Sequence, residues 1–167
     1  ALMCLQVLYA FIIFPTVQYS SMIPTLYEGD RIAVVMSKKL ERFDVVVFEV
    51  DVDILDKAPL EEDHNLWVKR VIGLPGDKVQ YIDGKLYIND QFVNEPFLYD
   101  EDGNPYQGTY KTSLPANLNG IVIPEGYYLC LGDNRSVSFD SRNVGLIPKS
   151  LIIGKGKYII YSLFDWK

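Results

Sequence analysis

Short apolar runs separated by turns dominate the chain, which is the pattern of a β-rich protein. The runs are rich in Val, Ile, Tyr and Phe, and Gly, Pro, Asn or Asp bound them. The pairs Asp83-Gly84 and Asn89-Asp90 separate three consecutive runs and are typical of two-residue hairpin turns. The pattern predicts a mainly β fold, with strands at residues 31–35, 44–50, 66–74, 79–82, 85–88, 91–93, 121–123, 127–131 and 152–161.

Residues 94–120 depart from this pattern. Turn-forming residues cluster at 100–105 and again at 117–120, with short aromatic pieces between them. We interpret this stretch as a small cap inserted into the domain. Residues 16–93 and 121–167 would then form the β core.

Residues 1–14 are apolar except for Gln6 and carry no charge. At ~1.5 Å per residue, a helix of ~14 residues spans ~21 Å, which is less than the ~30 Å of a bilayer core. We expect residues 1–15 to be the outer end of a truncated N-terminal transmembrane helix. Pro15 would end this helix, and residues 16–20 would form an extended link. The alternative is a buried or interfacial helix that closes the domain.

Composition and charge argue against several classes of function. The 167 residues suffice for one well-buried domain, and the net charge of −6 argues against a nucleic-acid partner. Cys4 and Cys130 do not suggest a disulfide framework, and we expect them to stay unpaired. The single histidine, His64, lies in a predicted exposed loop, so zinc and Ser-His chemistry lack their usual groups. We expect neither a metal nor a cofactor.

A lysine inside the apolar run at residues 66–74 points to chemistry. Successive residues of a strand face opposite sides, so Lys69 shares a face with Trp67 and Val71, whereas Arg70 lies on the other face. We expect one of these two cations to be poorly solvated. Burial lowers the pKa of a lysine from about 10.4, and a shift of ~3 units corresponds to ~4 kcal/mol, which would make a general base near neutral pH. The alternative is a lysine that extends to water or pairs with an acid.

Two segments of irregular backbone carry polar groups beside apolar runs. In residues 19–30, Pro24 excludes a regular helix and a central strand, so a serine there can sit at a turn whose backbone N–H groups point at a bound carbonyl. Residues 132–142 are polar and directly follow the predicted strand at 127–131. Each segment, taken alone, is also what an ordinary surface loop shows.

Taken together and in this order, three motifs resemble those of bacterial type I signal peptidases. The motifs are SMIPTL at residues 21–26 with GD at 29–30, KRVIGLPGD at 69–77, and GDNR at 132–135 with Ser138, Asp140, Ser141 and Arg142. The resemblance covers most of the chain. It implies a membrane-anchored catalytic domain built on an antiparallel β-sheet, outside the cytoplasmic membrane of a bacterium. Such enzymes cut signal peptides from exported proteins with a serine/lysine dyad.

The resemblance also implies roles for single residues. Ser21 matches the nucleophile of the family, and Lys69 matches the general base. Ser138 corresponds to the serine that hydrogen-bonds and orients this lysine, while Asp140 and Arg142 correspond to a supporting ion pair. The implied substrate-binding residues, along a groove where the substrate lies extended, are Tyr19, Ser20, Met22, Trp67 and Val68.

The oxyanion site departs from the family pattern. The resemblance implies that the backbone N–H of Ser21 supplies one donor. Some relatives place a serine hydroxyl two residues before the nucleophile as the second donor, but this chain has Tyr19 there. Ser20, at a position often held by Gly or an acid, is then the candidate for the second donor. The family prefers small residues at the first and third substrate positions before the cut, and we expect the same here.

Three other functions fit parts of the sequence. A self-cleaving repressor uses the same Ser/Lys pair, but it carries a basic DNA-binding region where this chain is apolar. A non-catalytic, signal-peptidase-like assembly factor on the membrane surface would have lost the serine or the lysine. A non-catalytic binding module would leave the ordered motifs unexplained. We expect a monomeric, single-pass peptidase whose partners are signal peptides and the lipid bilayer, and in which Arg70→Ala and His64→Ala retain much of the activity.

Overall fold

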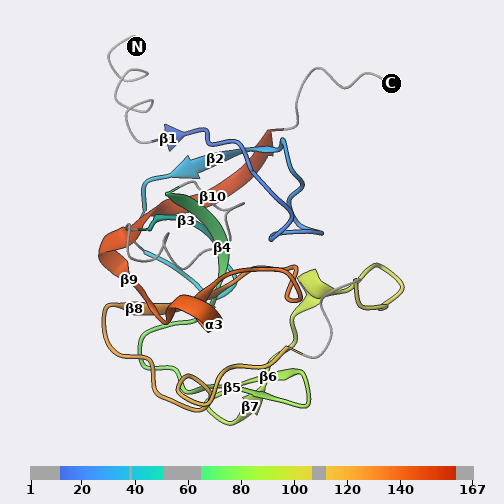
Figure 1. Ribbon diagram of the computed structural model, residues 1–167, viewed down its shortest axis with the longest axis vertical. Coiled ribbons are helices and arrows are strands. Elements are labelled where there is room, and N and C mark those ends of the chain that lie inside the picture. Colours follow the sequence, from blue (N-terminus) through green and yellow to red (C-terminus); the bar gives the residue numbers. More distant parts are fainter. Residues whose placement is uncertain (1–11, 38, 51–64, 107–111, 161–167) are drawn as a thin grey trace.

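The computed structural model describes residues 12–37, 39–50, 65–106 and 112–160, which form two antiparallel sheets (Figure 1). The larger sheet has seven strands in the order β1-β2-β10-β3-β4-β8-β9. These strands are β1 (Ile12–Ile13), β2 (Arg31–Val35), β10 (Ile152–Ile160), β3 (Val45–Glu49), β4 (Leu66–Gly73), β8 (Tyr127–Leu131) and β9 (Ile147–Pro148). The smaller sheet joins β5 (Val79–Ile82), β6 (Lys85–Ile88) and β7 (Gln91–Phe92). The predicted mainly β fold is therefore confirmed.

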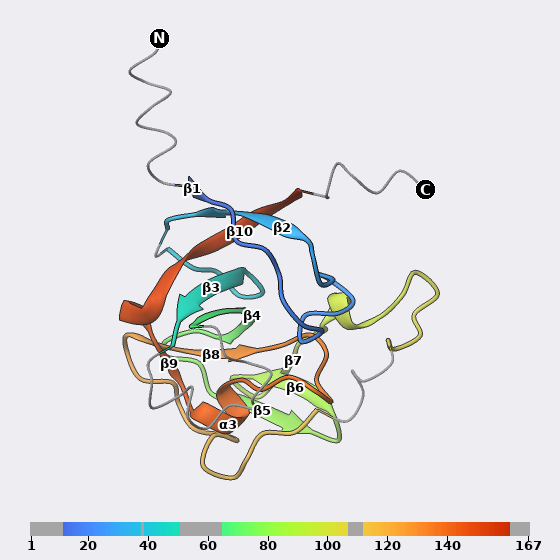
Figure 2. The same cartoon turned by 45° about the horizontal axis from the view of Figure 1, so that its top comes forward.

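Strand β4 lies at the centre of the packing. Figures 1 and 2 place β1, β2 and β10 at one end of the molecule and the small sheet at the other, with β4 and β8 between them. Three apolar clusters fill these layers, and β4 contributes to each of them. Ile72 packs in the cluster of the small sheet, Trp67 and Val71 in the middle cluster, and Val68 against the third. Burial on both faces explains why the run is almost continuously apolar.

Several predicted strands have the observed bounds. Strands β2, β5, β6 and β8 begin and end where the apolar pattern does. The hairpin turns are confirmed as well, because Asp83, Asn89 and Asp90 have φ values of 51°, 52° and 67°, which tight turns of the primed type require. The predicted strand at 121–123 is wrong, since only Val122 forms a single bridge there.

Five short elements are absent from the sequence prediction. They are β1, β9, the helix α3 (Ser141–Val144) and the 3₁₀ turns η1 (Pro96–Leu98) and η2 (Lys149–Leu151). Elements of two to four residues leave no periodicity from which to predict them. In the predicted cap, Leu98, Leu114 and Leu118 are buried in the cluster of the small sheet. The division into a core and an inserted cap stays a prediction.

The N-terminal segment is a strand where it is described. Ile12 and Ile13 pair with Val35 and Val34 of β2, so the predicted helix does not extend to residue 15. This pairing satisfies backbone hydrogen-bonding groups along the edge of β2, which favours a strand over a helix at residues 12–13. Residues 1–11, on which the rest of the predicted transmembrane helix falls, lie outside the described residues. Within the part of the chain that is described, no helix is long and apolar enough to cross a membrane.

Strand β10 leaves no room for a side chain at Gly154, where it pairs beside the end of β2. A Cβ added there would overlap the carbonyl oxygen of Val35 and would lie 3.0 Å from the Cα of Met36. At Gly156, in the same strand, the nearest atom would lie at 3.7 Å, which is an ordinary contact. The close approach of two backbones therefore fixes glycine at position 154 alone.

We expect Gly154→Ala to lower the free energy of unfolding by about 1–3 kcal/mol, because the backbone of β2 has to move away. The matched variant Gly156→Ala is expected to change it by less than about 1 kcal/mol, since it causes no overlap. Urea unfolding of both variants measures the difference. Equal destabilisation would contradict the packing described for Gly154.

Candidate active site

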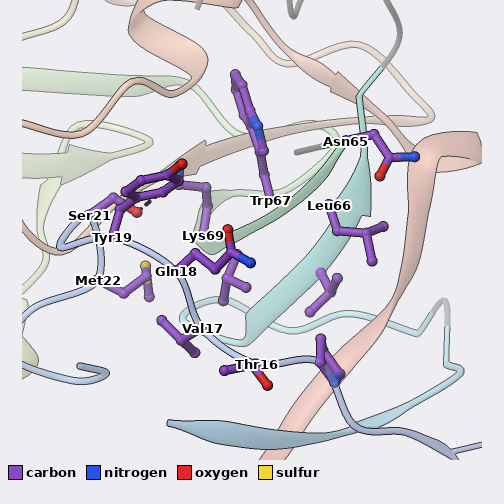
Figure 3. Close-up of a pocket in the computed structure, with 13 residues that line it drawn as sticks. Thr16, Val17, Gln18, Tyr19, Ser21, Met22, Asn65, Leu66, Trp67 and Lys69 are labelled. Atoms are coloured by element: carbon purple, nitrogen blue, oxygen red, sulfur yellow. Dashed lines mark hydrogen bonds between the residues drawn. The ribbon is translucent and has the colours of Figure 1, made fainter. Parts of the chain in front are cut away.

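A groove lies between the segment that precedes Ser21 and the first half of β4 (Figure 3). Its cavity volume is about 370 Å³. Residues 15–19, Ser21 and Met22 line it from one segment. Val47 of β3, Asn65 and residues 66–69 of β4 line it from the other side. Figure 3 shows Ser21 and Tyr19 toward one end of this groove.

The side chains of Ser21 and Lys69 meet in the groove. Lys69 Nζ lies 2.9 Å from Ser21 Oγ, within hydrogen-bond distance. Lys69 is only 2% exposed and Ser21 only 9% exposed. The Trp67 ring lies on the same face of β4, with its centroid 5.4 Å from Lys69 Nζ. The structure thus brings together the two residues that the motifs assign to the dyad, from β4 and from the serine turn (residues 21–25).

Both cations of β4 are buried, although the sequence predicts that only one is poorly solvated. Arg70 Nε and Nη2 donate to the two carboxylate oxygens of Asp133 at 2.8 and 2.6 Å. Nη2 also donates to Thr25 Oγ1 at 2.9 Å, and Nη1 donates to the carbonyl of Phe43 at 2.8 Å. The Phe97 ring covers the guanidinium at 4.0 Å. A bidentate carboxylate partner allows this charge to be buried.

Thr25 completes a triangle with this ion pair. Its hydroxyl donates to Asp133 Oδ2 at 2.5 Å, so the serine turn, β4 and the polar loop (residues 132–140) meet at one point. Arg70 directly follows Lys69, and Thr25 lies on the same turn as Ser21. The ion pair therefore holds the two segments of the dyad against each other. Alternation along β4 predicts the face of Arg70 but not its partner.

The polar loop also packs directly against the backbone of Ser21. Asn134 N–H donates to the carbonyl of Ser21 at 3.0 Å, and Asn134 Nδ2 donates to the carbonyl of Ser20 at 3.2 Å. A Cβ added at Gly132 would lie 2.5 Å from the Ser21 carbonyl oxygen and would overlap Ser138 Oγ. Glycine at this position therefore lets the loop reach Ser21.

Ser138 is buried next to Gly132, but its hydroxyl has no hydrogen-bond partner among the described residues. The expected hydrogen bond from Ser138 to Lys69 is thus not formed in this structure. The same Gly132 Cβ position lies close to both the Ser138 hydroxyl and the Ser21 carbonyl, so Ser138 approaches the backbone of Ser21 across this glycine. A buried hydroxyl without a partner costs free energy and is uncommon in folded proteins.

Asp140 and Arg142 form the expected ion pair. Arg142 Nη2 lies 2.8 Å from Asp140 Oδ2, and Asp140 also accepts the Gly132 N–H at 3.0 Å while capping α3. Burial raises the pKa of Asp140, but the hydrogen bonds and charge of Arg142 outweigh it, so the pKa lies below its ordinary value. The ionised carboxyl contributes stability above a pH of about 3.9, and this contribution is lost as the pH falls through the lowered pKa.

A second buried cluster ties the polar loop to the small sheet. Arg135 Nη2 donates to Glu95 Oε1 at 2.6 Å, and Arg135 Nη1 donates to the Tyr81 hydroxyl at 2.8 Å. Arg135 Nε donates in turn to the Gly132 carbonyl at 2.9 Å. Burial raises the pKa of Tyr81 well above its ordinary value, so the hydroxyl stays protonated and donates to Glu95. Nothing in the sequence distinguishes Glu95 from the other acids of the turn-rich stretch at residues 94–120.

The other predicted residues are partly in place. Tyr19, Met22, Trp67 and Val68 line the groove, as expected for substrate-binding residues. Ser20 does not line it and its side chain is exposed, because Asn134 and the turn hold the backbone there with its carbonyl inward. His64 and Cys4 lie outside the described residues. Cys130 is a buried free thiol whose pKa is raised by burial.

Comparisons with known proteins agree with this site. The family model described as "Signal peptidase, peptidase S26" matches residues 1–161. The chain is 42% identical over 168 residues to signal peptidase IB of Staphylococcus aureus, covering 94% of this chain and 82% of that protein. It is 35% identical over 176 residues to signal peptidase I of Streptococcus pneumoniae, covering 88% of this chain and 81% of that protein. The chain belongs to the signal peptidase family, peptidase S26.

The fold supports the same assignment. A crystal structure of signal peptidase I from Enterococcus faecalis matches with a TM-score of 0.53 and 33% sequence identity, and the match covers 70% of this chain and 96% of that chain. The resemblance inferred from the three motifs is confirmed. This signal peptidase is therefore an enzyme, of the serine peptidase class.

Arg70 is buried and bound to Asp133, so we now expect Arg70→Ala to be less well tolerated than the sequence suggests. Arg70→Ala leaves the Asp133 carboxylate buried without its cation, so we expect a loss of about 3–5 kcal/mol in the free energy of unfolding. The matched variant Lys78→Ala breaks the ion pair of Lys78 with Asp90, where both side chains are at least 36% exposed, and should cost less than about 1 kcal/mol. Urea unfolding measures both. A small and equal effect would show that the Arg70 pair does not hold the site together.

Proposed function

We propose that this enzyme removes signal peptides from exported preproteins, with Ser21 as nucleophile and Lys69 as general base. The observation that carries the proposal is the 2.9 Å contact between a lysine amine and a serine hydroxyl. Both side chains are nearly excluded from water, and both line one groove. A serine hydroxyl is a weak nucleophile until a base within hydrogen-bond reach takes its proton. Membership of the signal peptidase family supports the reaction class.

Lys69 acts as a base only in its neutral form, and its surroundings favour that form. Burial disfavours the ammonium, because the charge loses its hydration. The buried carboxylates of the polar loop are already bound to arginines, Asp133 to Arg70 and Asp140 to Arg142.

The reaction would run in two steps. The amine of Lys69 takes the proton of Ser21 as Oγ attacks the carbonyl carbon before the scissile bond, and the resulting ammonium gives the proton to the departing amine as the C–N bond breaks. Water then attacks the ester on Ser21, and Lys69 again takes and returns a proton. Ser138, whose buried hydroxyl has no hydrogen-bond partner among the described residues, would accept a hydrogen bond from the ammonium and orient it. The Asp140–Arg142 pair would support this loop.

One wall of the groove offers a strand edge to the substrate. Val50 N–H donates to the carbonyl of Asn65 at 2.8 Å, so alternation along the ladder turns the backbone groups of Leu66 and Val68 away from β3. Strand β8 pairs with β4 only from Arg70 onward. The groups of Leu66 and Val68 are thus oriented toward the groove that these residues line.

The facing wall has the same property. Val17 N–H donates to the carbonyl of Asp30 at 2.7 Å, and Gly29 N–H donates to the carbonyl of Val17 at 2.9 Å. The backbone groups of Thr16 and Gln18 therefore turn the other way, toward the groove. We propose that the substrate lies extended between the two walls, with alternate side chains in small apolar pockets that select small residues at the first and third positions before the cut.

The oxyanion would be stabilised by the backbone N–H of Ser21. No hydrogen bond among the described residues uses this N–H. The exposed side chain of Ser20 does not favour it as the second donor. We further propose that a monomer works at the outer face of the bacterial cytoplasmic membrane, attached to the lipid bilayer through the apolar run that precedes β1.

Cleavage of a preprotein in detergent tests the dyad. Ser21→Ala and Lys69→Ala are each expected to lower kcat at least about a thousandfold, because each removes a group that acts in the transition state. The matched variants Ser150→Ala and Lys78→Ala, at more exposed positions, should keep wild-type rates, and so should His64→Ala. Loss of activity in His64→Ala while Lys69→Ala stays active would refute the assignment. Binding of the preprotein without any cleavage by the wild type would favour a non-catalytic relative.

A further inference from the structure

Tyr19 has an unfavourable backbone conformation at the edge of the groove. Its φ of 63° lies in the left-handed region, which residues with a side chain adopt only at a cost. Glycine takes this conformation freely, and asparagine tolerates it better than tyrosine does. Strained residues of this kind persist where the surrounding structure fixes them, and they are common at functional sites.

The neighbours on both sides explain why the conformation is forced. Before Tyr19, Val17 is held by hydrogen bonds to Asp30 and from Gly29. After it, Asn134 holds the carbonyls of Ser20 and Ser21 at 3.2 and 3.0 Å. The chain passes from an extended segment into the serine turn between these anchors. Position 19 therefore needs the left-handed conformation whatever side chain it carries.

The side chain of Tyr19 is not part of the apolar core of the described residues. It is partly buried and belongs to none of the three apolar clusters of described residues. It lines the groove together with Ser21, Met22 and Lys69. Figure 3 shows the ring in the part of the groove where Ser21 lies. The aromatic ring thus takes up space in the groove next to the proposed nucleophile.

We propose that Tyr19 is a specificity-determining residue, whose ring limits the size of the substrate side chains nearest the cut. This inference rests on the proposed function, because it assumes that a peptide lies in this groove with its scissile bond at Ser21. The ring narrows the groove by its bulk, and the hydroxyl is not required for this effect. The residue therefore contributes selectivity rather than rate.

Selectivity of Tyr19 variants tests the inference. Peptide substrates carry Ala or Leu at each of the three positions before the cut, and kcat/KM is measured for each. In Tyr19→Gly and Tyr19→Asn we expect the preference for Ala over Leu to fall at least tenfold at the first position. It should stay unchanged at the third position, and Tyr19→Phe should keep the wild-type preference at all three. An unchanged preference in both small variants, or a changed one in Tyr19→Phe, would overturn the inference.

Two further measurements separate this inference from the proposed function. The same peptides are titrated into Ser21→Ala and into the double variant Ser21→Ala/Tyr19→Gly, where the ratio of the Kd values reports selectivity without cleavage. A tenfold shift in that ratio would support the role of Tyr19 in selectivity. If the wild type also cleaved no peptide, the proposed dyad would be refuted while this role of Tyr19 would still be supported. The midpoint of thermal unfolding of Tyr19→Gly should equal or exceed that of the wild type. Failure of both small variants to fold would assign the ring to stability and overturn the inference.

Discussion

The buried ion pair between Arg70 and Asp133 is the constraint on which the site depends. The Arg70 guanidinium is buried on the second face of β4. Such a buried charge is stable only with a bound carboxylate, and Asp133 accepts hydrogen bonds from its Nε and Nη2 at 2.8 and 2.6 Å. Thr25 binds both partners, so three segments that are distant in sequence meet at one point. Lys69 precedes Arg70, and Ser21 lies on the turn that carries Thr25. The placement of the proposed dyad thus depends on an interaction that takes no part in the proposed chemistry.

Strand alternation gives the two cations of β4 opposite surroundings. Arg70 faces the Asp133 carboxylate, whereas Lys69 faces Ser21 and the Trp67 ring. The polar loop contacts both the Arg70 side of β4 and the serine turn, because Asp133 binds Arg70 and Gly132 packs against the carbonyl of Ser21. In the proposed reaction Lys69 takes the proton of Ser21, while the pair of Arg70 and Asp133 takes no part in proton transfer.

The sequence predicts local features well and long-range partners poorly. Strands such as β5 and β6 follow from apolar runs bounded by Asp83-Gly84 and Asn89-Asp90, because hairpin turns act between neighbours in the chain. The specific motifs single out Ser21 and Lys69, which the structure places 2.9 Å apart, and their catalytic roles stay a proposal. The partner of Arg70 could not be predicted, because alternation gives the face on which a residue lies but not what it contacts. Glu95 and the two-residue strand β1 carry no local signal, and tertiary contacts alone select them.

The central claim is that Lys69 is uncharged when it meets Ser21, and NMR of the lysine side chains tests it most directly. In protein labelled with ¹³C-lysine, the Cε resonance that is missing from Lys69→Met is assigned to Lys69, and its shift is followed with pH. We predict a titration midpoint well below the usual lysine pKa of about 10.4, with a neutral amine at pH 8. A midpoint at or above 10.4 would show that Lys69 is a cation at working pH and would contradict the account.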